Sequence, residues 1–125
     1  MSHFDHLNEI VPLQIWNGVV GRVISGNDAS LAAISLEPGT KVPEHSHTNE
    51  QTGMLVSGSL TFRIGDESQD LAPGATWVIP ANVPHSVDTG PEGAFLIELF
   101  APPRADWAGL ERLDPSPPAG FSPTI

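Results

Sequence analysis

The chain has 125 residues, 39% of them hydrophobic, so it can bury the core of one domain but not a second sizeable one. It carries 15 acidic residues against 5 basic ones, a net charge of −10, and no cysteine. This charge argues against binding to nucleic acid or to an anionic membrane surface, and the lack of thiols excludes disulfides and thiolate metal sites.

The N-terminal residues 1–10 show no basic region followed by an apolar run, so no secretory signal is visible. No stretch of the chain approaches the ~20 consecutive apolar residues of a membrane-spanning helix. We therefore expect a cytoplasmic protein.

Short runs rich in Val, Ile, Leu and Phe follow one another, and turns containing Gly or Pro separate them. We expect nine strands, at residues 19–25, 31–36, 42–47, 51–57, 60–64, 68–71, 75–79, 85–87 and 94–100. Many short strands with frequent turns predict an all-β sandwich or barrel in a single domain.

The sequence divides into three segments. Residues 1–15 are predicted to be an N-terminal arm, residues 16–101 the barrel, and residues 102–125 a proline-rich C-terminal segment. Within the last segment, residues 106–113 carry a weak pattern for a short helix of about two turns. The prolines after Asp114 predict an extended tail that lies over the surface or against a partner subunit.

Three histidines stand in a pattern that predicts a metal site. His45 and His47 lie two residues apart in an expected strand, so their side chains point to one face, and by the same alternation Gln51 points there too. His85 comes from a later strand, directly after a proline. Imidazole nitrogens from two separate strands of a barrel are a plausible cradle for a divalent ion.

The spacing Gly39-x5-His45-x-His47-x3-Gln51-x6-Gly58 resembles the first motif of the cupin family, which usually has Glu where Gln51 stands. The spacing Gly74-x5-Pro80-x-Asn82-x2-His85 resembles the second motif, with Asn82 where Gly is usual and Thr89 where Asn is usual. The resemblance implies a jelly-roll β-barrel with a divalent metal at its centre.

The segment Glu50-Gln51-x-Gly53, with Glu-Gln where Glu-Glu is usual, and the segment Phe100-Ala-Pro-Pro-Arg104 after the last barrel strand carry a narrower resemblance. They are similar to the small cupins of pectin and alginate catabolism, which convert 4,5-unsaturated uronate monomers to the linear keto form. In that group three His and one Gln hold the metal, which implies His45, His47, Gln51 and His85 here. An acid, a Phe and an Arg in the last strand and the loop after it do the catalytic work in that group, which implies Glu98, Phe100 and Arg104 here. The acid is typically Asp, so the longer Glu98 is a departure.

The residue types at this site indicate its chemistry. Three neutral imidazoles and one neutral amide leave the full charge of a divalent ion uncancelled, which makes it a strong Lewis acid and attracts an anionic substrate. Nitrogen and oxygen ligands suit Ni, Fe, Zn, Co or Mn without choosing among them. Glu98 is expected on the same strand face as Leu96 and Phe100, where it could act as general acid and base, and Arg104 could bind a carboxylate with two hydrogen bonds.

Three functions remain open from the sequence. The first is a metal-dependent enzyme that opens or isomerises an unsaturated uronate or a similar small anion. The second is an Fe(II)-dependent cupin dioxygenase, or a lyase, acting on a small organic acid, although the neutral Gln51 favours polarisation over oxygen activation. The third is a cupin that binds a metabolite without catalysis. The resemblance also implies a homodimer, with the arm and tail as contacts.

Overall fold

The computed structural model describes residues 2–121 and is built almost entirely of β-strands. The nine strands are β1 (Leu13–Trp16), β2 (Val19–Ser25), β3 (Ser30–Leu36), β4 (Lys41–His45), β5 (Glu50–Ile64), β6 (Glu67–Leu71), β7 (Thr76–Ile79), β8 (His85–Ala101) and β9 (Glu111–Arg112). One short 3-10 helix, η1 (Ala105–Gly109), follows β8. None of the helices in this part of the chain has the length and apolar character needed to cross a membrane.

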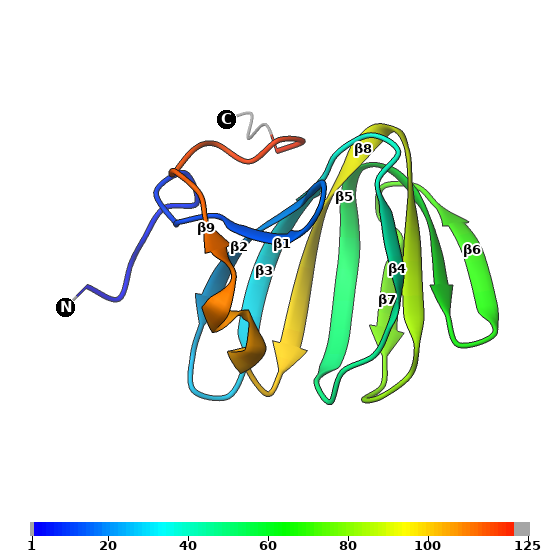
Figure 1. The fold of residues 1–125 in the computed structure, drawn as a ribbon, viewed down its shortest axis with the longest axis horizontal. Coiled ribbons are helices and arrows are strands. Elements are labelled where there is room, and N and C mark those ends of the chain that lie inside the picture. The colour runs from blue at the N-terminus through cyan, green and yellow to red at the C-terminus, as the bar shows by residue number, and fades with distance from the viewer. Residues whose placement is uncertain (1, 122–125) are drawn as a thin grey trace.

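All strands belong to one antiparallel sheet, which curls round so that its inner face covers the hydrophobic core (Figure 1). Its order is β6-β5-β8-β3-β2-β1-β9, with β4 paired to β8 and β7 paired to β5. The two long strands β5 and β8 run side by side through the whole sheet, and each changes its second partner half-way along. This arrangement gives the all-β jelly-roll that the sequence predicts.

The prediction of separate strands at residues 51–57 and 60–64, with a turn at 57–59, is wrong, because both lie in β5. Gly58 has a φ of +81°, and the register of β5 against β8 shifts on both sides of it. The backbone therefore bulges at Gly58 instead of turning. A Cβ on Gly58 would clash with the carbonyl oxygen of Gly93 on β8.

The strands predicted at residues 85–87 and 94–100 likewise form the single strand β8, because β5 pairs with it on both sides of Gly93. The segment predicted as a helix at 106–113 is instead the 3-10 turn η1 followed by the short strand β9. Strand β1 begins at Leu13, within the residues assigned to the N-terminal arm.

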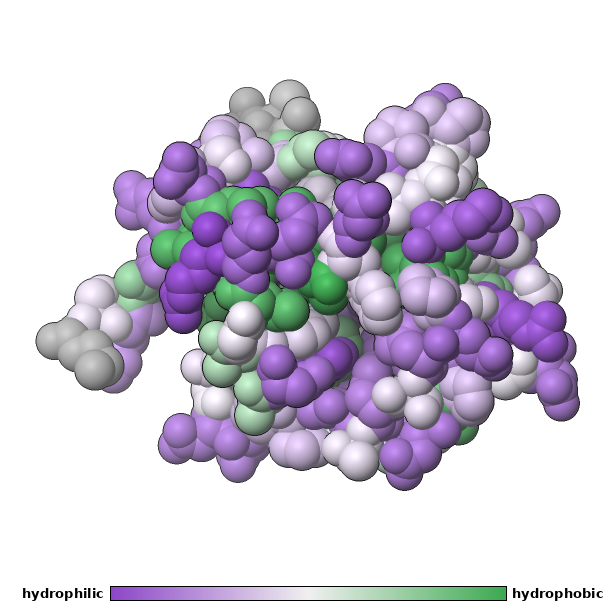
Figure 2. Space-filling view, viewed as in Figure 1, coloured by the Kyte–Doolittle hydropathy of each residue, from purple (hydrophilic) through white to green (hydrophobic). Residues whose placement is uncertain are grey.

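The C-terminal tail lies over the outer face of the sheet. The hydroxyl of Ser35 donates to the carbonyl of Ala119 over 2.8 Å, and the buried Arg22 guanidinium donates to the carbonyl of Ser116 over 2.8 Å. The Phe95 side chain is buried beneath this tail, on the opposite face from the barrel core. Hydrophilic side chains cover most of the face seen in Figure 2, and hydrophobic ones are visible between them.

Candidate metal centre

Three histidines from separate segments meet inside the barrel. His45 ends β4 and pairs across the sheet with His85, the first residue of β8. The ring centroids of these two residues are 4.3 Å apart, and that of His47 is 4.9 Å from His85. One ligand nitrogen from each of the three lies within 4.8 Å of the others. The sequence therefore predicted three residues that the fold brings together.

His47 is not in a strand as predicted, because β4 ends at His45 and residues 46–49 form a loop. Hydrogen bonds outside the strand ladder hold this loop. The backbone N–H of Asn82 donates to the carbonyl of His47 over 2.8 Å, and the Asn49 side chain donates to the carbonyl of Pro102. His47 reaches the cluster by loop geometry instead of strand alternation.

Each histidine is oriented by its own backbone. The Nδ1 atom of each ring bonds a main-chain carbonyl two residues away, over 2.8 Å for His45, 3.0 Å for His47 and 2.9 Å for His85. A carbonyl only accepts, so Nδ1 carries the hydrogen and, in a neutral ring, the lone pair is left on Nε2. Burial lowers the pKa of His47 and lowers that of His85 to about 4, which keeps both rings neutral near pH 7.

Gln51, on the inner face of β5, places a side-chain oxygen beside the histidines. Its amide nitrogen donates to a carboxylate oxygen of Glu98, which fixes the amide so that Oε1 lies 2.9 Å from Nε2 of His47. Both atoms then present lone pairs, an arrangement that a cation stabilises. Two ligand atoms about 2.1 Å from one ion and at a right angle would be about 3.0 Å apart.

The buried polar atoms also fit a metal ion. Nε2 of His85 is fully buried and has no hydrogen-bond partner among residues 2–121. A buried nitrogen lone pair without a partner is costly unless something binds it. The site has the donors for a divalent ion with nitrogen and oxygen ligands, and these donors do not decide which ion it is.

Glu98 lies beside this cluster and is one of three residues that are paired across the neighbouring strands β7, β5 and β8. Gly53 of β5 pairs with Trp77 of β7 on one side and with Glu98 of β8 on the other. Because Gly53 has no side chain, the Trp77 indole can lie over it, and its N–H donates to Oε2 of Glu98 over 2.9 Å. A Cβ on Gly53 would come within 2.5 Å of that indole nitrogen.

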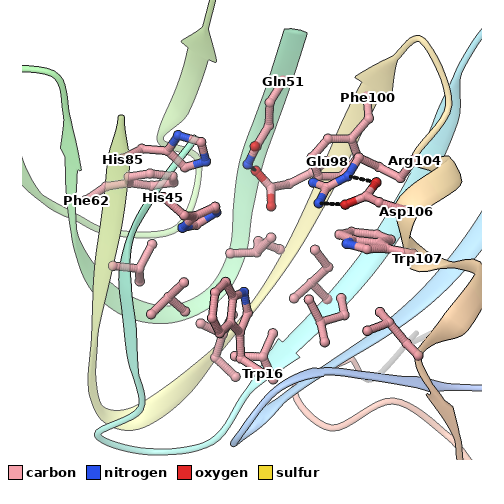
Figure 3. Close-up of a pocket in the computed structure, with 18 residues that line it drawn as sticks. Trp16, His45, Gln51, Phe62, His85, Glu98, Phe100, Arg104, Asp106 and Trp107 are labelled. Atoms are coloured by element: carbon pink, nitrogen blue, oxygen red, sulfur yellow. Dashed lines mark hydrogen bonds and ion pairs between the residues drawn. The ribbon is translucent and has the colours of Figure 1, made fainter. Parts of the chain in front are cut away.

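The Glu98 carboxylate is buried, and burial raises its pKa to about 6 although the hydrogen bonds from Gln51 and Trp77 act in the opposite direction. In Figure 3 the carboxylate faces the cavity, with Gln51 on one side and Arg104 on the other. A carboxyl with a pKa near neutrality is suited to both accept and donate a proton.

Arg104 follows β8 and turns back over the cavity. Its guanidinium donates to both carboxylate oxygens of Asp106, over 3.0 and 2.9 Å, and lies 4.9 Å from the ring of Phe100 and 4.3 Å from that of Trp107. Its side chain is only 9% exposed. A guanidinium stacked on aromatic rings and shielded from water binds anions strongly.

These groups surround a cavity of about 240 Å³. His45, Gln51 and His85 line it together with Glu98, Phe100 and Arg104 (Figure 3), whereas His47 is outside the lining and contacts Gln51. Trp16 approaches from β1, with its ring 5.3 Å from that of His45, and so closes the barrel on that side.

Two contributors to the site were not assigned a role from the sequence. Trp77 packs against Phe62, and its indole N–H also donates to Glu98. Asn49 orients His47 through its carbonyl and ties the loop to the segment after β8. Gly53, a glycine within an expected strand, was the available signal for close packing at this point.

Comparison with known proteins places the chain in a family. Residues 33–100, more than half of the chain, match the family profile of the cupin domain, and they include the whole histidine cluster. The chain therefore belongs to the cupin family.

Particular cupins are similar to it at modest identity. The pectin degradation protein KdgF of Dickeya dadantii is 26% identical over 96 residues, which cover 75% of this chain and 87% of that protein. The structure of KdgF from Halomonas sp. superposes with a TM-score of 0.76 and 22% identity over 85% of this chain and 98% of that one. An RmlC-like cupin from Shewanella frigidimarina gives a TM-score of 0.79 and 22% identity over 86% of this chain and 97% of that one.

H2HPP isomerase of Bacillus subtilis is 33% identical over 70 residues. These residues are 55% of this chain but 30% of that protein, so the match spans less than a third of the relative's length. The likeness to KdgF supports the resemblance drawn from the metal-site motif.

Proposed function

We propose that this cupin is a metal-dependent isomerase that shifts a proton within a small unsaturated carboxylate. The linearisation of 4,5-unsaturated uronate monomers is the reaction to test first. The observation that carries the proposal is the contact between Gln51 and Glu98, which couples the metal-binding donor set to a buried carboxylate that faces the cavity. The similarity to KdgF, whose printed name places it in pectin degradation, supports the choice of substrate.

His45, His47, His85 and Gln51 would hold the ion. A bound divalent ion supplies a Lewis acid that polarises a substrate oxygen. Arg104 binds the substrate carboxylate with the part of its guanidinium that Asp106 does not use, and Phe100 and Trp107 keep that guanidinium in place.

Glu98 moves the proton. In the uronate, its carboxylate takes the proton of the ring-opening hydroxyl, the ring carbon–oxygen bond breaks, and the resulting enol carbon receives a proton as the ketone forms. Substrate and product have the same atoms, so no oxidant or further reactant is needed. Trp77 and Gln51 hold one oxygen of Glu98, which leaves the other available to the substrate.

The test is the loss of the conjugated alkene's ultraviolet absorbance when metal-loaded protein is mixed with 4,5-unsaturated galacturonate. We expect a metal-dependent rate well above the spontaneous one. Glu98→Gln should abolish it with the metal still bound, and Arg104→Met should raise KM more than it lowers kcat. Rates near wild type in both variants would overturn the two roles.

A dioxygenase, a lyase and a metabolite-binding cupin are the other outcomes of this test. Oxygen consumption by the Fe(II)-loaded protein would support the first, and tight binding of a small acid without turnover would support the last. The homodimer and the cytoplasmic location stay predictions from the sequence, and a monomeric mass in solution would contradict the homodimer.

A further inference from the structure

The cavity beside the metal centre is strongly asymmetric in polarity. Of the 18 residues that line it, six are polar, and in Figure 3 they lie together along one side of the cavity. These six are His45, Gln51, His85, Glu98, Arg104 and Asp106. The residues drawn without labels, which occupy the other side, are all aliphatic: Ile15, Val19, Ile34, Leu36, Val42, Val87, Leu96 and Leu110.

On the polar side, the groups left for a substrate are one oxygen of Glu98 and the part of the Arg104 guanidinium that Asp106 does not use. His45, His85 and Gln51 belong to the metal-binding set, and Arg104 and Asp106 bind each other. The described residues that line the cavity include no Ser, Thr, Asn, Tyr or Lys, so its other side-chain donors are the indole N–H groups of Trp16 and Trp107. A ring hydroxyl that points toward the eight aliphatic residues would therefore find no side-chain partner there.

This lack of partners sets the cost of binding a hydroxylated substrate. A hydroxyl that leaves water without gaining a hydrogen bond costs about 1–3 kcal/mol. A hydrocarbon group in the same place gains about 25 cal/mol for each Å² that it removes from water. Both effects favour a substrate whose body is hydrocarbon on the side that faces the aliphatic residues.

We infer that the preferred ligand is a carboxylate with a hydrocarbon ring or chain, not a polyhydroxylated sugar acid. Its carboxylate lies against Arg104, its reacting carbon faces Glu98, and its hydrocarbon part packs on the aliphatic side of the cavity. The inference rests on the proposed function and narrows its substrate class. The reaction remains a proton shift in an unsaturated carboxylate, and the substrate that binds most tightly carries fewer hydroxyl groups than a uronate.

A matched pair of probes tests this inference without turnover. Cyclohex-1-ene-1-carboxylate and shikimate have the same ring, alkene and carboxylate, and differ by the ring hydroxyls of shikimate. We would measure the affinity of each for the zinc-loaded protein by titration calorimetry. Cyclohexenecarboxylate is expected to bind at least about tenfold more tightly, as one unpaired hydroxyl implies. Equal or tighter binding of shikimate, or binding of neither acid, would overturn the inference.

A substitution in the aliphatic side sharpens the test. Val42→Thr keeps the side-chain shape and adds a hydroxyl to the cavity lining, so it should reduce the preference for the hydrocarbon acid. Val78→Thr makes the same change on the exposed outer face, where Val78 is 62% exposed, and should leave the preference unchanged. An unchanged preference in Val42→Thr, with its fold verified by circular dichroism, would count against the inference.

The two proposals fail in different ways. Turnover of unsaturated galacturonate with no preference for the hydrocarbon acid would sustain the isomerase and overturn the substrate class. Preferential binding of cyclohexenecarboxylate, with no turnover of any unsaturated carboxylate offered, would sustain the ligand class and overturn the isomerase.

Discussion

The two sides of the barrel cavity are built on different principles. On the polar side, formed by β4, β5 and β8, hydrogen bonds hold the reactive side chains in one arrangement. On the aliphatic side, to which β1, β2 and β3 contribute half of the eight residues, only shape and volume matter. Hydrogen bonds are directional and a buried unpaired donor is costly, whereas apolar packing tolerates changes that conserve volume. The polar side should therefore be far less tolerant of substitution.

The largest expected effect is on metal binding. His85→Ala removes the buried imidazole at the centre of the cluster, and we expect affinity for zinc or nickel to fall by more than about 100-fold, beyond the loss typical of an outer-shell change. Competition with a chromophoric chelator measures the change. His47→Ala, at a less buried position, repeats the test if the first variant does not fold.

His6→Ala is the matched control, since His6 is exposed and lies outside the cluster. Its metal affinity should equal that of the wild type. If His85→Ala and His47→Ala both kept wild-type affinity, these histidines would not be the metal ligands.

The next largest effect is expected on stability, at the contact between Gly53 and the Trp77 indole beside Glu98. In Gly53→Ala the new methyl group would meet the Trp77 indole at 2.5 Å, so the indole must move and its hydrogen bond to Glu98 must weaken. Overpacking of this kind costs about 1–3 kcal/mol of unfolding free energy, measured by urea denaturation.

Gly26→Ala is the control for this substitution, because a Cβ there has its nearest neighbour at 3.8 Å and the turn has no positive φ to preserve. It should change stability little. Equal stabilities for the two variants would mean that the Trp77 indole does not depend on the space at Gly53.

The sequence predicted the residues on the polar side of the cavity better than the contacts that hold those residues in place. Side-chain alternation along 94–100 put Glu98 on the same strand face as Leu96 and Phe100, and in the structure all three line the cavity. Alternation needs only local spacing. The contact between Trp77 and Glu98 depends on the register of three strands that are distant in sequence, and no local pattern encodes that register.

The fold prediction was confirmed as all-β, but the strand boundaries near glycine were wrong. Gly58 lies between two serines, a combination typical of a turn. It forms a bulge instead because β8 continues beside it and supplies the hydrogen-bond partners on both sides. Whether a glycine forms a turn between two strands or a bulge within one strand depends on whether the neighbouring strand continues beside it.

A smaller effect is expected on the aliphatic side. Ile34→Val removes one methylene from the lining, which costs about 0.5–1.5 kcal/mol of unfolding free energy. Metal affinity, measured with the same chelator, should stay at the wild-type value because no ligand touches this position. A loss of metal affinity comparable with that of His85→Ala would show that the two sides are not independent.

The smallest effect is expected from the ion pair at the cavity mouth. Hydrogen bonds from Arg104 hold the pKa of Asp106 below its usual range, so this pair stabilises the fold at neutral pH and loses its contribution as the pH falls through that lowered pKa. Because the Asp106 side chain is 60% exposed, Asp106→Asn should cost less than about 1 kcal/mol at pH 7, and the difference from wild type should shrink in acid.

The same variant tests what positions Arg104. The guanidinium stacks on both Phe100 and Trp107 without help from Asp106, so carboxylate affinity should fall only a few-fold in Asp106→Asn. Asp88→Asn breaks the exposed pair with Lys41 and serves as the control, with no effect on ligand binding. A loss of affinity in Asp106→Asn as large as that in Arg104→Met would mean that the ion pair, and not the aromatic rings, aims the guanidinium at the cavity. The polar side would then extend to an exposed residue, and its geometry would depend on salt concentration.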